Sequence, residues 1–220
     1  MRISILGYEN EIEFEDGYVN VLNIQNKHLF TNIISTLNEL CNNDKYETNE
    51  IALHDDNGIC KFNQYAEIVL DFFNIEINSK KIIVKLYDEI SKNIDDIDKS
   101  NVLKLTNELR QLLFLKAEEL EFNFEMSNEV SIVELLKLYD LKIDKNMYID
   151  FTEKLNFLVD VISTLNIAKI LILPNLKLYL DENEVEEFYK YALYKDLNIL
   201  VIENGIDNKL LKYEKVFSID

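Results

Sequence analysis

The sequence is poor in the residues that build common catalytic and cofactor sites. Its 220 residues include four glycines, one proline, two cysteines, two histidines and no tryptophan. With so few glycines, the chain contains no G-x-x-x-x-G-K-[ST], G-x-G-x-x-G or G-x-S-x-G motif. The cysteines and histidines are too few for a disulfide framework or for the usual zinc or haem ligands. The commonest nucleotide-binding, hydrolase and metalloenzyme signatures are therefore excluded.

Positive charge is also scarce. The chain has 41 acidic and 23 basic residues, a formal charge of −18, and two of its basic residues are arginines. Nucleic acid should repel such a chain at long range, so DNA binding would require lysines concentrated on one surface. The shortage of arginine argues against reading of base edges. A hydrophobic content of 48 % nevertheless predicts a folded chain and not a disordered acidic tail.

Long hydrophobic runs are absent. The most apolar segments, such as 169–173 and 199–202, are far shorter than a bilayer crossing. Residues 1–15 carry acidic side chains where a signal peptide needs a basic and then an apolar region. We therefore expect a cytoplasmic protein without a membrane-spanning segment.

The two ends of the chain are typical of an α/β domain. At the start we expect strands over 1–6, 11–14 and 18–22, with Asp16-Gly17 closing a hairpin, then a helix over 28–40. Short strands are also expected at 50–53 and 59–62. Near the end, strands at 169–173 and 198–202 flank a helix that Asp181 can cap, which predicts two parallel strands and a crossover helix.

The middle of the chain has a helical pattern. Ser79 can cap a helix that continues to about Ile90, and a second helix is expected from about Asp98 to Glu118. Ser131 and Glu134 form a capping-box pattern before a short helix, and another helix is expected over 146–164. We therefore predict an α/β domain made of 1–77 and 166–220, interrupted by a helical domain at 78–165.

One segment between these helices alternates in a way that suggests a metal site. In an extended chain, Leu120, Phe122 and Phe124 would share one face. The oxygen-bearing side chains of Glu119, Glu121, Asn123 and Glu125 would share the other face, about 7 Å apart. Oxygen ligands without histidine or cysteine suit calcium, and Glu129 or Glu134 could complete the shell. An edge strand with a solvated acidic face has the same pattern, and Glu134 is also explained by its helix cap.

No residue is assigned a catalytic role. His28 and His54 are possible acid or base groups, but neither pairs with a serine or cysteine nucleophile in an interpretable arrangement. We expect both to be structural or surface residues, and we expect no enzyme activity.

The order of the elements resembles a known family. The runs that carry the resemblance are DGYVNVL (16–22), SIVELLKLYDLKID (131–144), AKILILPN (168–175), LDENEV (180–185) and LNILVIE (197–203). They are similar to the short form of the Csn-two family, the CRISPR-associated adaptation proteins of type II-A systems. Each motif is weak alone, and the resemblance depends on their shared order over nearly the whole chain.

The resemblance implies a fold and a function. Members of this family have an α/β head related to P-loop ATPases and a helical leg, and they form a homotetrameric ring. The ring binds ends of linear double-stranded DNA without sequence preference, is stabilised by calcium, and supports spacer acquisition without a known catalytic step. Other adaptation proteins and the effector nuclease of the same system are the implied partners.

The resemblance also suggests sites. The family's calcium segment falls on Glu119, Glu121, Asn123, Glu125 and Glu129, although Asn123 stands where relatives have a carboxylate. The proposed DNA contacts, on or beside the leg helices, are Lys80, Lys81, Lys137 and Lys142. The loop matching a phosphate loop, 23–27, lacks glycine, and Pro174-Asn175 stands where a Walker-B acid would end its strand. Nucleotide hydrolysis is therefore not expected.

Two other functions remain open from the sequence. An acidic protein–protein interaction scaffold or DNA mimic with a degenerate ATPase-like head would explain the charge more simply. A degenerate nucleotide-binding enzyme is the third possibility, and detectable ATP binding would favour it.

Overall fold

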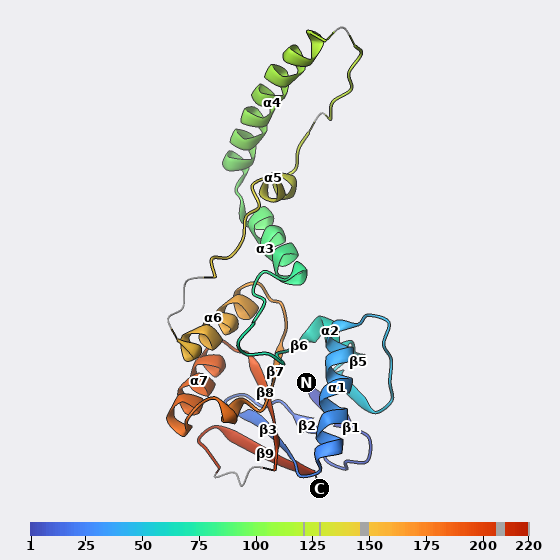
Figure 1. Cartoon of the computed structure of the whole chain (residues 1–220), viewed down its shortest axis with the longest axis vertical. Helices are drawn as coiled ribbons and strands as arrows, with labels where there is room; N and C mark the ends of the chain where they lie inside the picture. Colours follow the sequence, from blue (N-terminus) through green and yellow to red (C-terminus); the bar gives the residue numbers. More distant parts are fainter. Residues whose placement is uncertain (121, 128, 146–149, 206–209, 220) are drawn as a thin grey trace. The chain divides into compact units, whose positions relative to one another are not determined.

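The computed structural model describes residues 1–120, 122–127, 129–145, 150–205 and 210–219. The chain forms two compact units (Figure 1). We call Met1–Ile77 with Lys145–Asp220 the head unit, and Asn78–Asp144 the leg unit. None of the described helices is both long enough and apolar enough to cross a membrane.

The head unit contains a five-stranded parallel sheet in the order β6-β7-β8-β3-β9. Its strands are β3 (Val19–Ile24), β6 (Ala66–Ile68), β7 (Ile170–Pro174), β8 (Asn198–Asn204) and β9 (Glu214–Ile219). Every residue of β3 and β7 is buried, as expected for central strands of a sheet with both faces covered. The predicted parallel pair is confirmed, because β7 and β8 are neighbours joined through a helix.

A smaller antiparallel sheet has the order β2-β1-β4-β5. Its strands are β1 (Arg2–Ile5), β2 (Ile12–Glu13), β4 (Ile51–Asp55) and β5 (Gly58–Cys60). The expected hairpin through Asp16-Gly17 is wrong: β2 pairs with β1, while β3 enters the parallel sheet between β8 and β9. All six residues of β3 are buried, so a central position in a covered sheet suits this strand better than a position in an exposed hairpin.

Helices cover both faces of the parallel sheet. They are α1 (Lys27–Asn42), α2 (Phe62–Tyr65), α6 (Phe151–Thr164), the 3₁₀ turn η1 (Leu176–Leu178) and α7 (Glu182–Tyr194). Figure 1 shows α1 on one side of the sheet and α6 with α7 on the other. Helix α1 and the antiparallel sheet contribute to one hydrophobic core. In this core, Ile33 and Leu37 of α1 pack with Leu22 and Ile202 of the parallel sheet. On α7, Asp181 and Glu184 form the expected capping box.

The leg unit contains α3 (Lys80–Asn93), α4 (Asp96–Glu118) and α5 (Ile132–Leu138). The predicted caps are present: the Ser79 hydroxyl accepts from the Ile82 N–H, and Ser131 and Glu134 form a capping box. The unit ends at Asp144 and not at residue 165, because α6 buries side chains such as Leu155 and Ile162 in the head unit. Helix α6 itself begins after Asp150, and the predicted helical residues 146–149 lie outside the described ranges.

Candidate nucleic-acid interface and acidic segment

Helix α3 carries four lysines, Lys80, Lys81, Lys85 and Lys92. Ile82 and Tyr87 are its buried residues, and Lys85 and Lys92 are exposed. Among the described residues, Lys80, Lys85 and Lys92 have no salt bridge, whereas Lys116, Lys142 and several other lysines do. At 100° per residue, Lys81, Lys85 and Lys92 lie within roughly 40° of one another around the helix, with Asp88 among them. This stripe is the most suitable phosphate-binding feature of the leg unit.

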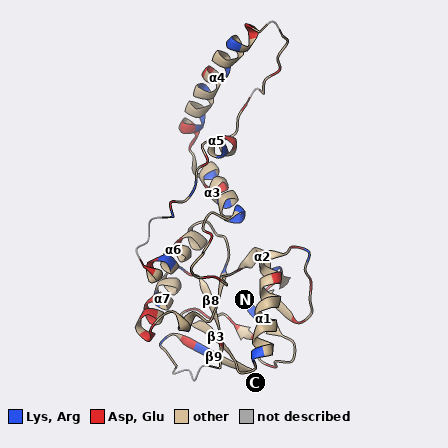
Figure 2. Ribbon diagram, viewed as in Figure 1, with Lys and Arg blue, Asp and Glu red and all other residues tan. Residues whose placement is uncertain are grey.

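Both units are acidic, and the head unit has the larger negative charge, partly because it is more than twice as long. By sequence, the leg unit has 14 acidic and 10 basic residues, a net charge of −4, and the head unit holds the remaining −14. Helix α3 alone has four lysines against Asp88 and Glu89, and the positive residues on it are visible in Figure 2. A DNA duplex would therefore meet the least repulsion at the leg unit.

Three of the four predicted DNA contacts lie on helices that pack together. Lys80 and Lys81 belong to α3, and Lys137 lies on α5, which packs against α3. Lys142 differs, because its Nζ lies 2.6 Å from an oxygen of Asp140 and this hydrogen bond raises the pKa of the lysine. Lys85 and Lys92 were not among the predicted contacts, although the period of the helix places them near Lys81.

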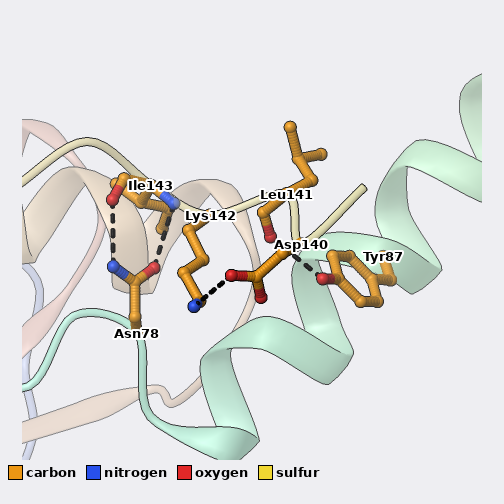
Figure 3. A network of polar contacts seen from close by, with 6 residues as sticks. All are labelled: Asn78, Tyr87, Asp140, Leu141, Lys142 and Ile143. Carbon is orange, nitrogen blue, oxygen red and sulfur yellow. Dashed lines mark hydrogen bonds and ion pairs between the residues drawn. The ribbon is translucent and has the colours of Figure 1, made fainter. Parts of the chain in front are cut away.

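The base of the leg unit is closed by a set of hydrogen bonds (Figure 3). Asn78 donates to the Ile143 carbonyl and accepts from the Ile143 N–H, both at 2.9 Å. The Tyr87 hydroxyl donates to the Leu141 carbonyl at 2.9 Å. Asp140 has a φ of 49°, a left-handed conformation that turns the chain after α5. The returning segment is therefore fastened to the start of α3 within the same unit.

The acidic segment is irregular over its described part, and the Phe122 and Phe124 rings lie next to each other with centroids 6.3 Å apart, as expected for residues on one face. The described residues between Glu119 and Val130 form neither helix nor strand, and Leu120 and Phe122 are 60 % and 73 % exposed. The alternative interpretation as an edge strand is wrong for the described part, since the segment has no strand partner there. Glu121 lies outside the described residues.

The described oxygen donors of this segment are dispersed. Glu119 pairs with Lys116 at 2.6 Å, while Asn123, Glu125 and Glu129 are exposed. The carboxylate of Glu134 accepts from the N–H and hydroxyl of Ser131, and these hydrogen bonds lower its pKa. Over the ranges described, no three His, Cys, Asp or Glu side chains are grouped to hold a metal ion. The donor chemistry suits calcium, but the described donors are not assembled in a single chain.

The β3–α1 connection differs from a phosphate-binding loop in its hydrogen bonds. The Asn26 side chain accepts from the N–H groups of His28 and Leu29 at 2.9 and 3.1 Å. Phosphate sites at helix starts use such free N–H groups, and here the chain itself occupies them. After β7, Asn175 occurs in a left-handed conformation where a Walker-B acid would stand.

The head unit contains a buried charge network that was not predicted from the sequence. The Lys177 Nζ is 2.7 Å from Glu214 Oε1, which also accepts from the Tyr189 hydroxyl at 3.1 Å. Glu203, at the end of β8, is fully buried and accepts from the Lys177 N–H at 3.0 Å. Burial raises the pKa of Glu203 to about 7. These residues are far apart in sequence, so no local pattern identifies the network.

Helix α4 exposes apolar residues and has no buried one. Seven of its large apolar side chains are 46–71 % exposed, and at 100° per residue they cover roughly 240° of the helix. They are Ile97, Leu103, Leu105, Leu109, Leu112, Leu113 and Leu115. The helix has four acidic and four basic residues, so it has no net charge in a chain of charge −18.

Comparison with known proteins identifies the family. A family model described as CRISPR-associated protein (Cas_Csn2) matches residues 42–216. A CRISPR-associated protein Csn2 from Enterococcus faecalis is 27 % identical over 160 residues, which cover 67 % of this chain and 72 % of that protein.

Solved structures are also similar to this chain. The crystal structure of Stu0660 of Streptococcus thermophilus has a TM-score of 0.65 at 17 % identity, covering 99 % of this chain and 74 % of that one. A nucleotide-free ATP-binding cassette from an ABC transporter has a TM-score of 0.49 at 12 % identity, covering 99 % of this chain and 86 % of that one. The expected fold class, an α/β head with a helical leg, is confirmed by the elements of the two units. Because the family model spans most of the sequence, the chain belongs to the Csn2 (Csn-two) family of CRISPR-associated proteins.

Proposed function

We propose that this chain is a non-catalytic protein that binds ends of linear double-stranded DNA and supports spacer acquisition in a type II-A CRISPR system. It would act in the cytoplasm as a homotetrameric ring stabilised by calcium. Family membership supports the CRISPR role. The observation that carries the DNA-binding part is the stripe of lysines on α3, in the less acidic of the two units.

The proposed DNA contact is electrostatic. Lys80, Lys81 and Lys137 are the proposed contacts on α3 and α5, and we add Lys85 and Lys92 on α3 to them. Lys142 would have to leave Asp140 before binding a phosphate. Lysine contacts to phosphates carry no sequence information, so affinity should depend strongly on salt and weakly on sequence.

The proposed assembly uses α4. An apolar surface that covers more than half of a helix is typical of a helix buried among neighbours. A second copy of the chain is a suitable neighbour, because α4 has no net charge and copies would repel one another least there. Contacts on more than one side of α4 are compatible with a tetramer.

The proposed calcium ligands are Glu119, Glu121, Asn123, Glu125 and Glu129, with Glu134 as a further candidate. Calcium bound there would offset the repulsion among these carboxylates. Because their described members are dispersed in the single chain, the segment would need to rearrange or receive ligands from another copy. Glu119 would exchange its salt bridge with Lys116 for the metal.

The proposed absence of catalysis is supported by the β3–α1 connection. Asn26 occupies the N–H groups that a nucleotide phosphate would need, and the loop has no glycine. The proposed partners, besides DNA, are other adaptation proteins and the effector nuclease of the same system.

The first experiment measures mass by light scattering, with and without calcium, and tests binding of linear and closed-circular duplex DNA by gel shift. We expect a calcium-stabilised tetramer that shifts linear DNA and does not shift circular DNA. A monomer or dimer indifferent to both DNA forms would refute the ring and favour an acidic interaction scaffold, which the head unit's charge of −14 would suit.

Variants assign the proposed sites. Lys85→Ala should weaken DNA binding and reduce the salt slope by about 1, whereas Lys190→Ala, which alters an exposed side chain of α7, should do neither. Glu125→Gln should raise the calcium concentration needed for assembly, with Glu187→Gln as its control. If Glu125→Gln and Glu121→Gln together leave calcium-dependent assembly unchanged, the ligand assignment is wrong.

A further inference from the structure

Four aromatic rings from three segments form one cluster in the head unit. Phe72 and Phe73 follow β6, Phe151 begins α6, and Tyr179 follows η1. The Tyr179 ring lies 5.2 Å from Phe72, 5.5 Å from Phe73 and 5.9 Å from Phe151, measured between centroids. We call these four residues the aromatic platform.

The platform is anchored on one side and exposed on the other. Phe72 is buried, while Phe73 and Tyr179 are 66 % and 44 % exposed. Leu70 and Leu178, which neighbour them in sequence, are 50 % and 66 % exposed. The exposed apolar side chains of the loop after β6 and of the η1 segment therefore lie next to one another. A single exposed aromatic residue such as Tyr194 differs from such a group.

Hydrogen bonds fix the loop that carries Phe73. One oxygen of Asp71 accepts from the N–H groups of Phe73 and Asn74, and the other accepts from the Asn74 side chain at 2.7 Å. The Lys154 ammonium donates to the Phe73 carbonyl. An exposed aromatic group held in this way loses little conformational entropy on binding.

The surroundings of the platform are acidic. Asp71 precedes Phe72, Asp150 precedes Phe151, and Asp181 caps α7 two residues after Tyr179. The Lys154 ammonium donates to the Phe73 carbonyl, and Lys177, two residues before Tyr179, pairs with the buried Glu214. The whole head unit has a charge of −14, so this surface should repel both DNA and a second head unit.

We propose that the aromatic platform is a docking surface for a basic protein that itself handles DNA. The inference rests on the proposed function, since proteins that bind DNA phosphates carry the basic surfaces that complement an acidic one. An apolar or arginine side chain of the partner would contact Phe73 and Tyr179, and its cationic rim would face the three aspartates. The platform thereby separates protein binding on the head unit from DNA binding on α3.

The test uses the whole 220-residue chain and the other CRISPR-associated proteins of the same system, each purified separately. Their binding is measured by calorimetry at low and high salt for the wild type, Phe73→Ala and Tyr179→Ala. Tyr194→Ala is the matched control, because Tyr194 is an exposed aromatic residue (79 %) at the end of α7, outside the platform. Mass and DNA-end binding are measured for every variant.

We expect one basic partner to bind the wild type, with salt weakening the complex. Each platform variant should weaken it about tenfold or more, as is usual for an aromatic interface anchor, while Tyr194→Ala should not. Mass and DNA binding should be unchanged in all variants. If the wild type binds the partner but does not bind DNA ends, the proposed function is refuted and the platform remains supported.

Three results would overturn the platform. The first is that no purified CRISPR-associated protein binds a wild type that still binds DNA ends. The second is equal partner affinity of Phe73→Ala, Tyr179→Ala and the wild type. The third is a lower mass of Phe73→Ala alone, which would show that a second copy of the chain occupies the surface.

Discussion

Glu203 should make the head unit less stable as the pH rises towards neutrality. Its side chain is fully buried at the end of β8 and receives one hydrogen bond, from the Lys177 N–H. Burial opposes ionisation, and the charge of Glu214 opposes it further, while the Lys177 charge and N–H favour it. The substitution Glu203→Gln keeps the shape and the acceptor oxygen and removes the titrating group.

The sign and size follow from the two pKa values. The pKa of Glu203 is about 7 in the folded protein, against an ordinary value of 4.5. Below pH 4.5 the Glu203 carboxyl is protonated in both the folded and the unfolded chain, so it causes no loss of stability there. Between pH 4.5 and 7 the unfolded chain ionises first, and at 1.36 kcal/mol per pKa unit the folded state loses roughly 3 kcal/mol of stability.

Urea unfolding followed by circular dichroism tests this prediction between pH 5 and 8, at fixed protein concentration. The difference in unfolding free energy between Glu203→Gln and the wild type should shift in favour of the variant as the pH rises, by up to about 3 kcal/mol. Glu187→Gln, which alters an exposed carboxylate, should show almost no such shift. A difference for Glu203→Gln that stays constant over this pH range would refute the reasoning.

Two further predictions concern the buried network and the base of the leg. Lys177→Met removes the cation paired with buried Glu214 and should lower the free energy of unfolding by about 3–5 kcal/mol. Its control, Lys190→Met, breaks an exposed pair and should lower it by about 1 kcal/mol or less. Equal losses for the two variants in urea unfolding would contradict this prediction. Asn78→Ala removes both hydrogen bonds to Ile143 and should accelerate hydrogen exchange of the Ile143 N–H, while Asn78→Asp keeps the acceptor and should preserve most of its protection. Unchanged exchange in Asn78→Ala would show that the Asn78 side chain does not protect this N–H.

The elements that the sequence predicts well have strong local signals. Ser79, Ser131 and Asp181 cap the helices expected of them, and α1 follows the period of its apolar residues. The segments β6, α2 and β9 were missed, because β6 and α2 are short and depend on neighbours distant in sequence. The path of β3 was misjudged for a related reason, since a turn residue such as Gly17 does not specify which sheet the next strand joins.

The site was less predictable than the fold. Lysines on α3 could be selected from sequence, but the neutralisation of Lys142 by Asp140 depends on the left-handed turn that brings them together. The acidic segment shows the opposite case: its alternation predicts a strand, yet a strand requires a partner, and the described part of the segment has none. The pairing of Lys177 with Glu214 is a tertiary contact without any local pattern.

The division of charge between the two units connects these findings. A protein that binds DNA phosphates gains nothing from a head unit of charge −14, so that charge requires another explanation. If DNA contacts the lysines of α3, repulsion from the head unit keeps the duplex at the leg unit and leaves the acidic surface available to a basic protein. Adding lysines to the head unit would then increase nonspecific DNA affinity and weaken partner binding, two effects that calorimetry and gel shifts measure separately. Increased DNA affinity with unchanged partner binding would show that the head unit's acidity serves only to exclude DNA.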